Sequence, residues 1–289
     1  MIVRIHAAGV VARRKLFESL ISPGLYLALT VGLALGFFLV TGFIGSIDSG
    51  GFHYTSNPAY DLIGRSFEGA FGKTFVEKLF AEGPFLFALY VSFLPILLYL
   101  AVSSAFRFGF EKKVGAVELI TYGPADGTAY FIASIMKDVI LTVLSLAVLL
   151  IFFSVSALLN NLVLGPMFLQ STFLLLFVSL AVFAYGILSS TITESSAAAV
   201  ALFLGAMAFF LLIMLGSFTI ISRHVQTLSG AILWAVKWLS PFFYWDLGMR
   251  GFSEAKVGVS VLSLGLLSVL TGLMLILSHF VLRKKGVRP

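Results

Sequence analysis

Long apolar runs separated by short polar connections dominate the pattern of this sequence. Six of the runs come close to the roughly 20 residues that an α-helix needs to cross a bilayer. We expect these spans at about residues 25–44, 84–106, 139–159, 168–189, 197–221 and 257–282. The pattern therefore predicts an all-α polytopic membrane protein. Residues 1–289 would form one transmembrane domain, since the connections are too short for a separate soluble domain.

A basic segment, residues 1–22, precedes the first apolar run. Wound as a helix, it gathers its mainly apolar and small residues on one side: Ile5, Gly9, Ala12, Leu16 and Leu20. It gathers most of its charged residues on the other side: Arg4, Arg14, Lys15 and Glu18. This imperfect amphipathic pattern favours a helix lying in the membrane interface, with a plain basic tail as the alternative.

Composition supports lipid as the main solvent of the chain. Apolar residues make up 60% of it and charged residues only 11%, a balance that a soluble domain does not show. Cysteine is absent, which excludes disulfides, thiol catalysis and zinc sites made of Cys. The net charge of +6 is typical of basic flanks around membrane spans, so we expect no nucleic-acid partner.

The distribution of basic residues predicts the orientation. Six spans put both termini on one side, and the segments on that side hold twelve Lys and Arg residues against seven on the other side. The positive-inside rule then places both termini in the cytoplasm, with residues 45–83 and 222–256 outside. We expect a multi-pass protein of the plasma or inner membrane.

The predicted spans contain no Asp, Glu, Lys or Arg away from their ends. Ion-coupled carriers usually keep such residues near the midplane, so their absence argues against ion-coupled transport and ion pores. Gly72-Lys73-Thr74 suggests a P-loop, but the required earlier glycine is replaced by Phe67. No catalytic constellation is visible, and His53 and His224 are too few for a metal site. We expect no enzyme activity, metal or cofactor in this chain, and any ATP hydrolysis would belong to a partner.

The polar stretch 107–138 is the expected docking surface for that partner. Glu111 and Glu118 are seven residues apart, so a helix places them on one face; a solvated face without a partner is the alternative. Thr191-x-x-Glu194 resembles a capping box at the start of the fifth span. Residues 222–256 hold all three tryptophans and predict interfacial helices before the last span.

Three ordered motifs resemble permease subunits of type-2 ABC exporters, closest to the prokaryotic group associated with gliding motility and copper-enzyme maturation. The first runs from Arg13 to Pro23, the second from Phe110 to Leu119 with Gly123-Pro124, and the third from Leu239 to Phe243. The resemblance covers essentially the whole chain. It departs at Ala116, where the family usually has threonine, and at Ala129 and Ser134, where an acid and a lysine are common.

The resemblance implies an N-terminal elbow helix over residues 1–23 and a coupling helix in the first cytoplasmic loop. It implies contacts to two P-loop ATPase subunits, which would hold ATP and Mg²⁺, and pairing with a second permease copy or paralogue. Residues expected at the ATPase are Glu111, Lys112, Lys113, Gly115, Glu118, Pro124 and Glu194. Small residues expected at the subunit interface are Gly32, Gly36, Ala197, Ala201 and Gly205, although they are equally suited to packing within one subunit.

The leading hypothesis is therefore the membrane subunit of an ATP-driven exporter of an apolar or amphiphilic substrate. Two alternatives stay open: an ATPase-linked complex that acts on membrane or periplasmic proteins without transport, and a lipid scramblase that works without ATP.

Overall fold

The protein is an all-helical bundle, seen in a computed structural model that describes residues 2–48, 65, 84–114, 127–216, 234 and 236–285. The helices within these ranges are α1 (Ile2–Leu20), α2 (Pro23–Asp48), α5 (Pro84–Lys113), α7 (Gly127–Leu159), α8 (Pro166–Ile192), α9 (Ser196–Gly216), α11 (Pro241–Ser253) and α12 (Val257–Lys285). No strand occurs in the described part of the chain. Six of the helices are long and apolar enough to cross a membrane, which confirms the predicted fold class and a multi-pass membrane protein.

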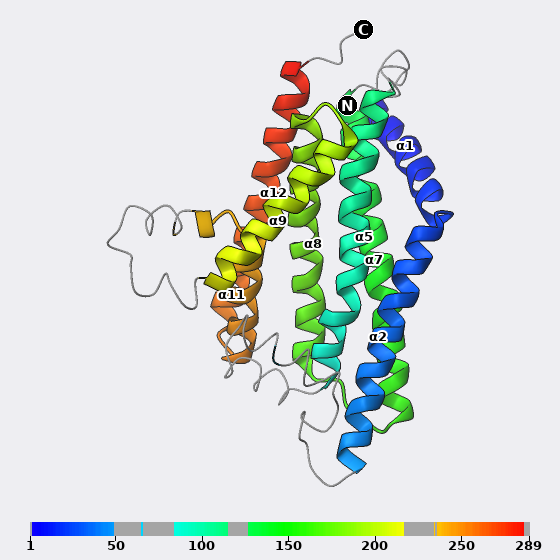
Figure 1. The fold of residues 1–289 in the computed structure, drawn as a ribbon, viewed down its shortest axis with the longest axis vertical. Helices are drawn as coiled ribbons and strands as arrows, with labels where there is room; N and C mark the ends of the chain where they lie inside the picture. Colours follow the sequence, from blue (N-terminus) through cyan, green and yellow to red (C-terminus); the bar gives the residue numbers. More distant parts are fainter. Residues whose placement is uncertain are drawn as a thin grey trace.

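The two most enclosed spans are α5 and α8. In each, 67% of the most apolar window is buried, against 28–33% in the other four spans. Helix α2 packs against α5, and α12 packs against α8, so the bundle extends sideways from this central pair (Figure 1). The outer spans leave large apolar side chains exposed, such as Leu27, Leu212 and Phe280, as expected for surfaces that contact lipid.

Both ends of the described chain lie at the same end of the bundle, where α1 begins and α12 finishes (Figure 1). This agrees with an even number of spans. Helix α1 leans across that end and packs against α7. We call this end of the molecule the α1 end.

Helix α1 is amphipathic, but one charged residue lies on a different face from the one predicted. Its packed face consists of Ala8, Ala12, Lys15 and Ser19, each at most 9% exposed, at the spacing of one helix side. Val10 and Phe17 are more than half exposed. The assignment of Lys15 to the outward polar face is therefore wrong, because its ammonium finds partners on α5 and α7.

Close helix approach explains two glycines of α2. Both Gly32 and Gly36 are buried against α5. A Cβ at Gly32 would clash with the carbonyl oxygen of Ser92, and one at Gly36 would lie 2.7 Å from the Ser92 hydroxyl oxygen. These glycines pack within the chain, which is the alternative that the sequence left open, and their surface is already covered by α5.

The small residues of α9 behave differently. Ala197, Ala201 and Gly205 are all exposed, and nothing lies within 4 Å of a Cβ built at Gly205. This face of α9 is open to lipid or to another subunit.

The helices around the predicted cytoplasmic loop are longer than the apolar runs. Helix α5 continues to Lys113 and α7 begins at Gly127, so residues 107–113 and 127–138 are helical rather than part of a connection. The candidate spans reach Glu111 on α5 and begin at Thr128 on α7, so the helices run past the span ends predicted at 106 and 139. Polar residues extend these helices because their side chains find partners at the α1 end.

The residue that caps α9 differs from the one predicted. Thr191 lies inside α8, and Ser195 caps α9 by accepting a hydrogen bond from the Ala198 amide at 3.1 Å. The predicted capping box at Thr191 and Glu194 is therefore wrong, since α8 continues past Thr191. Glu194 is exposed in the short connection.

Helix α11 makes up most of the described part of the predicted aromatic interfacial region. It packs against α8 and α12 and lies beside the first half of α12 (Figure 1). The Ser263 hydroxyl of α12 donates to the Tyr244 carbonyl at 2.5 Å, and a Cβ at Gly251 would clash with the Ser260 hydroxyl. These contacts hold α11 closely against α12.

Candidate functional site

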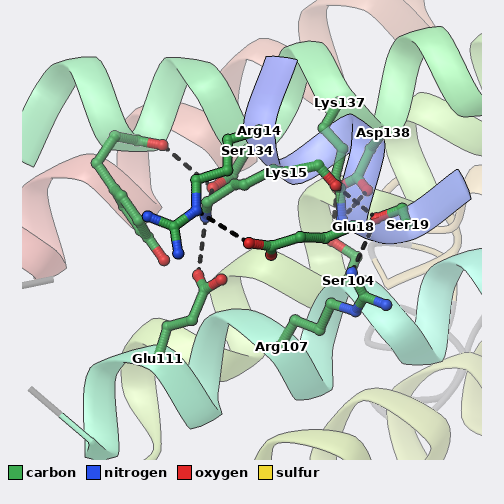
Figure 2. Close-up of polar contacts among 11 residues, drawn as sticks. Arg14, Lys15, Glu18, Ser19, Ser104, Arg107, Glu111, Ser134, Lys137 and Asp138 are labelled. Carbon is green, nitrogen blue, oxygen red and sulfur yellow. Dashed lines mark hydrogen bonds and ion pairs between the residues drawn. The ribbon is translucent and has the colours of Figure 1, made fainter. Parts of the chain in front are cut away.

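A cluster of charged side chains connects α1, α5 and α7 at the α1 end (Figure 2). We call it the charged cluster and define it by Lys15, Ser19, Ser104, Arg107, Glu111, Ser134, Lys137 and Asp138. Helical spacing brings the members of each helix to one face, since Ser104, Arg107 and Glu111 follow one another by three and four residues. On α7, Lys137 and Asp138 lie three and four residues after Ser134.

Lys15 lies at the centre of the charged cluster. Its Nζ donates to Glu111 Oε2 at 2.8 Å and to Ser134 Oγ at 2.9 Å, and it lies 3.6 Å from the centroid of the Tyr130 ring. Burial lowers the pKa of Lys15 from 10.5 to about 8, while Glu111 acts in the opposite direction. The ammonium is thus bound to α5 and α7 together.

A second group of contacts lies deeper along the same helices. The Asp138 carboxylate accepts a hydrogen bond from the Ser104 hydroxyl at 2.7 Å and pairs with the Lys137 ammonium at 2.8 Å. Arg107 donates to the Ser19 hydroxyl at 2.9 Å. Lys137 and Asp138 are at most 5% exposed, so their charges are held by these partners rather than by water.

The presence of these residues on α5 and α7 corrects an expectation from the sequence. Two candidate spans, Phe85–Glu111 and Thr128–Leu159, include charged residues. Lys137 and Asp138 lie about three turns inside α7. The sequence analysis argued against ion-coupled transport because the predicted spans hold no charged residue away from their ends. The longer candidate spans do hold such residues, so that argument no longer applies.

The geometry leaves little room for a ligand among the side chains of the charged cluster. The free space among these side chains amounts to only about 10 Å³, about the minimum for one water molecule. Separating α1 from α5 would break the Lys15–Glu111 ion pair, and separating α1 from α7 would break the Lys15–Ser134 hydrogen bond. Loss of the partner of a largely buried charge is strongly unfavourable. The charged cluster therefore joins three helix ends into one unit.

The structure separates the residues that the sequence assigned to ATPase contact. Glu111 is bound to Lys15, and its side chain is 24% exposed. Lys113 and Glu194 are exposed. Lys112 belongs to α5, but its side chain lies outside the description. Gly115, Glu118 and Pro124 lie outside the described residues, as do His53 and His224.

The start of α9 lies close to the end of α5. A Cβ built at Gly109 would lie 3.1 Å from the Ser196 Cα. The exposed connection that contains Glu194 therefore lies next to the end of α5, from which residues 114–126 depart. The end of α5 and the α8–α9 connection, which are far apart in the sequence, thus lie close together at the α1 end.

Sequence reasoning missed Lys15, Arg107, Lys137 and Asp138 as members of one site. The sequence does contain a pattern that could have indicated this site. From Ser104 to Glu111 and from Ser134 to Asp138, polar residues continue the helical spacing of the apolar runs. A prediction from hydropathy alone places the end of each helix at its first charged residue, and therefore misses this continuation.

The chain matches no protein-family model, and no curated protein is found to be similar to it.

Proposed function

We propose that this chain is the membrane subunit of an ATP-driven transporter, in which a separate P-loop ATPase acts on residues 114–126 and on the connection at Glu194. The observation that supports it most is the double attachment of Lys15 to Glu111 on α5 and Ser134 on α7. These helices border residues 114–126 on either side. A force applied there would reach α1, α5 and α7 together, because a buried ion pair holds their ends.

The proximity of the end of α5 to the α8–α9 connection supports a single docking partner. The Gly109–Ser196 approach brings the exposed Glu194 connection beside the end of α5. A partner large enough to contact residues 114–126 would also meet Glu194. We propose Glu118 as the main contact and Lys113 as an exposed basic neighbour.

The rest of the proposal concerns assembly and substrate. Two copies, or this chain and a paralogue, would pair, with the open α9 face of Ala197, Ala201 and Gly205 between them. Small residues there would let two backbones approach closely. The substrate would be apolar or amphiphilic, because the buried residues of α5 and α8 beyond the charged cluster are apolar or carry hydroxyl groups.

Copurification tests directly whether a P-loop ATPase binds this chain. The tagged chain is extracted in mild detergent from its own membranes, and bound proteins are identified and assayed for ATP hydrolysis. We expect a P-loop ATPase in the complex, with its activity changed by the chain. If no such ATPase associates, and added candidates keep their activity, the proposal is wrong.

Charge reversal separates docking from folding. We expect Glu118→Arg to insert normally but to reduce ATPase association and any ATP-dependent flux. Lys256→Glu is the matched control, since Lys256 is exposed beyond α11. Normal association and flux in the Glu118 variant would remove its role. Equal flux in proteoliposomes with and without ATP would favour a scramblase instead.

A further inference from the structure

A second polar site lies between the end of α9 and α11, away from the charged cluster. It is a pocket of about 250 Å³ that we call the α11 pocket. Its wall is apolar at Ile213, Met214, Leu247 and Phe243, and polar at Lys237, Ser240, Asp246 and Arg250. Ser240, Phe243, Leu247 and Arg250 follow one another at helical spacing, so one face of α11 forms most of the pocket.

The described side chains that line the pocket carry one more positive charge than negative, since Lys237 and Arg250 face one acid, Asp246. Arg250 binds Asp246 through two contacts, at 3.0 and 3.1 Å, which neutralises both. Lys237 lies 4.4 Å from the centroid of the Phe243 ring and makes no ion pair with a described residue. Residues 217–235 contain no acid in their sequence. Burial lowers the pKa of Lys237, against a smaller effect of Asp246, as expected for a cation that lacks a close anion.

The N-terminus of α11 adds two features that favour an anion. Ser240 is its N-cap, yet the side chain makes no capping hydrogen bond. The hydroxyl oxygen is buried and has no hydrogen-bond partner among the described residues, and Ser240 is only 2% exposed. A helix start also presents the positive end of the helix dipole. Lys237, the Ser240 hydroxyl and the start of α11 thus offer positive charge and a donor to one anion.

The surroundings indicate that this anion belongs to a lipid. The pocket is smaller than typical pockets for drug-sized ligands, so it has room for a headgroup but not for acyl chains. Phe209 and Leu212 on the neighbouring face of α9 are exposed and offer a surface for such chains. Trp234 and Trp238 are also exposed nearby, as is typical of the headgroup region. Tyr244 lies level with Ser263, about 9 Å along α12 from its start.

We propose that the α11 pocket binds the phosphate of an anionic phospholipid, with Lys237 and Ser240 as its direct contacts. The acyl chains lie along the outer face of α9. The site does not depend on the proposed ATPase partner, and it binds lipid in the isolated chain. Its occupancy gives the buried Ser240 hydroxyl and the Lys237 ammonium the partner that the described part of the chain does not supply.

Tryptophan fluorescence gives a direct readout, because all three tryptophans of the chain lie between residues 234 and 245. Trp238 contacts Phe243, with ring centroids 5.2 Å apart. The full chain is placed in phosphatidylcholine nanodiscs with increasing fractions of phosphatidylglycerol brominated on its acyl chains. We expect stronger quenching than with brominated phosphatidylcholine at equal fraction. Equal quenching by the two lipids would overturn the proposal.

Three variants test the contacts. Lys237→Gln should lower the preference for phosphatidylglycerol about tenfold, the usual worth of a hydrogen bond to a charged group. Lys237→Arg keeps the charge and should keep the preference, which guards against a folding defect in the first variant. Lys256→Gln, the matched control, removes an exposed charge and should change nothing. An unchanged preference in Lys237→Gln would contradict the site.

Two further arms test the electrostatics and the source of the phosphate. Asp246→Asn raises the net charge of the pocket and should increase the preference; a decrease would contradict the assignment. Millimolar inorganic phosphate should leave the quenching by brominated phosphatidylglycerol unchanged. If inorganic phosphate abolishes it in the wild type but not in Lys237→Gln, the site binds free phosphate and the lipid proposal is wrong.

Discussion

The Nζ of Lys15 on α1 lies 2.8 Å from Oε2 of Glu111 at the end of α5, although the two residues are 96 positions apart. The same ammonium reaches Ser134 on α7. One side chain therefore holds together three helices that no local sequence pattern connects. The consequences of this contact can be measured on the isolated protein.

Removal of one partner of this pair should be strongly destabilising. Glu111→Gln leaves the Lys15 ammonium buried without its counterion, and we expect a loss of about 3 kcal/mol in unfolding free energy. The double variant Lys15→Met with Glu111→Leu should recover much of that loss, because no charge stays buried. Thermal and denaturant unfolding in detergent would measure both. Equal stabilities of the single and double variants would argue against a buried pair.

The pH dependence of stability has a defined sign. The pKa of Lys15 is about 8 in the folded protein and 10.5 as its ordinary value, so between these values the unfolded chain binds more protons. The contribution of Lys15 to stability should then rise with pH across this window, by on the order of 3 kcal/mol. The measurement is the stability difference between wild type and Lys15→Met at several pH values from 7 to 10.5. A difference that falls or stays flat would contradict the burial of this ammonium.

A hydroxyl on α5 should contribute to the stability of the acid on α7. Ser104 donates to Asp138 at 2.7 Å, and a hydrogen bond to a charged group is worth about 2 kcal/mol. We expect Ser104→Ala to lose about this much, measured by unfolding in detergent. The matched control is Ser103→Ala, at the neighbouring, half-buried position of α5. A similar effect of both changes would mean that the loss comes from helix packing and not from the hydrogen bond.

The glycines of α2 and α9 should respond in opposite ways to the same substitution. Gly32→Ala forces a Cβ against the Ser92 carbonyl oxygen, and overpacking of this kind costs roughly 1–3 kcal/mol. Gly205→Ala meets nothing within 4 Å and should be neutral or stabilising, since alanine favours the helix. Thermal unfolding of the two variants side by side checks this. Loss of stability at Gly205 in the isolated chain would be inconsistent with its open face.

Gly205 also offers a test of subunit pairing. Gly205→Leu should leave a single chain stable but should disrupt close helix approach, if α9 meets a second copy as proposed. Crosslinking through single cysteines on α9 would report pairing, because the natural chain has no cysteine. Unchanged crosslinking in this variant would mean that α9 does not form the interface.

The sequence by itself determined the class of the protein and the approximate places of its helices. Apolar runs near 20 residues must become spanning helices, because only closed backbone hydrogen bonding is tolerated in lipid. The amphipathic pattern of residues 1–22 likewise predicted α1. These features depend on local composition and on the bilayer, and so they can be read along the chain.

Tertiary structure decided which polar residues act together. The sequence pattern predicted Lys15 on the polar side of its helix. It predicted Arg107, Glu111, Lys137 and Asp138 in a connection, because a charge normally ends a span. Four of them instead find a partner on another helix, and Lys137 pairs with the adjacent Asp138 on α7. These partners make their burial possible. Likewise, Gly32 and Ala201 have the same small-residue signal, yet one packs against α5 and the other is exposed. Pairing between distant segments depends on how the helices pack, and the pattern of a single helix does not contain that information.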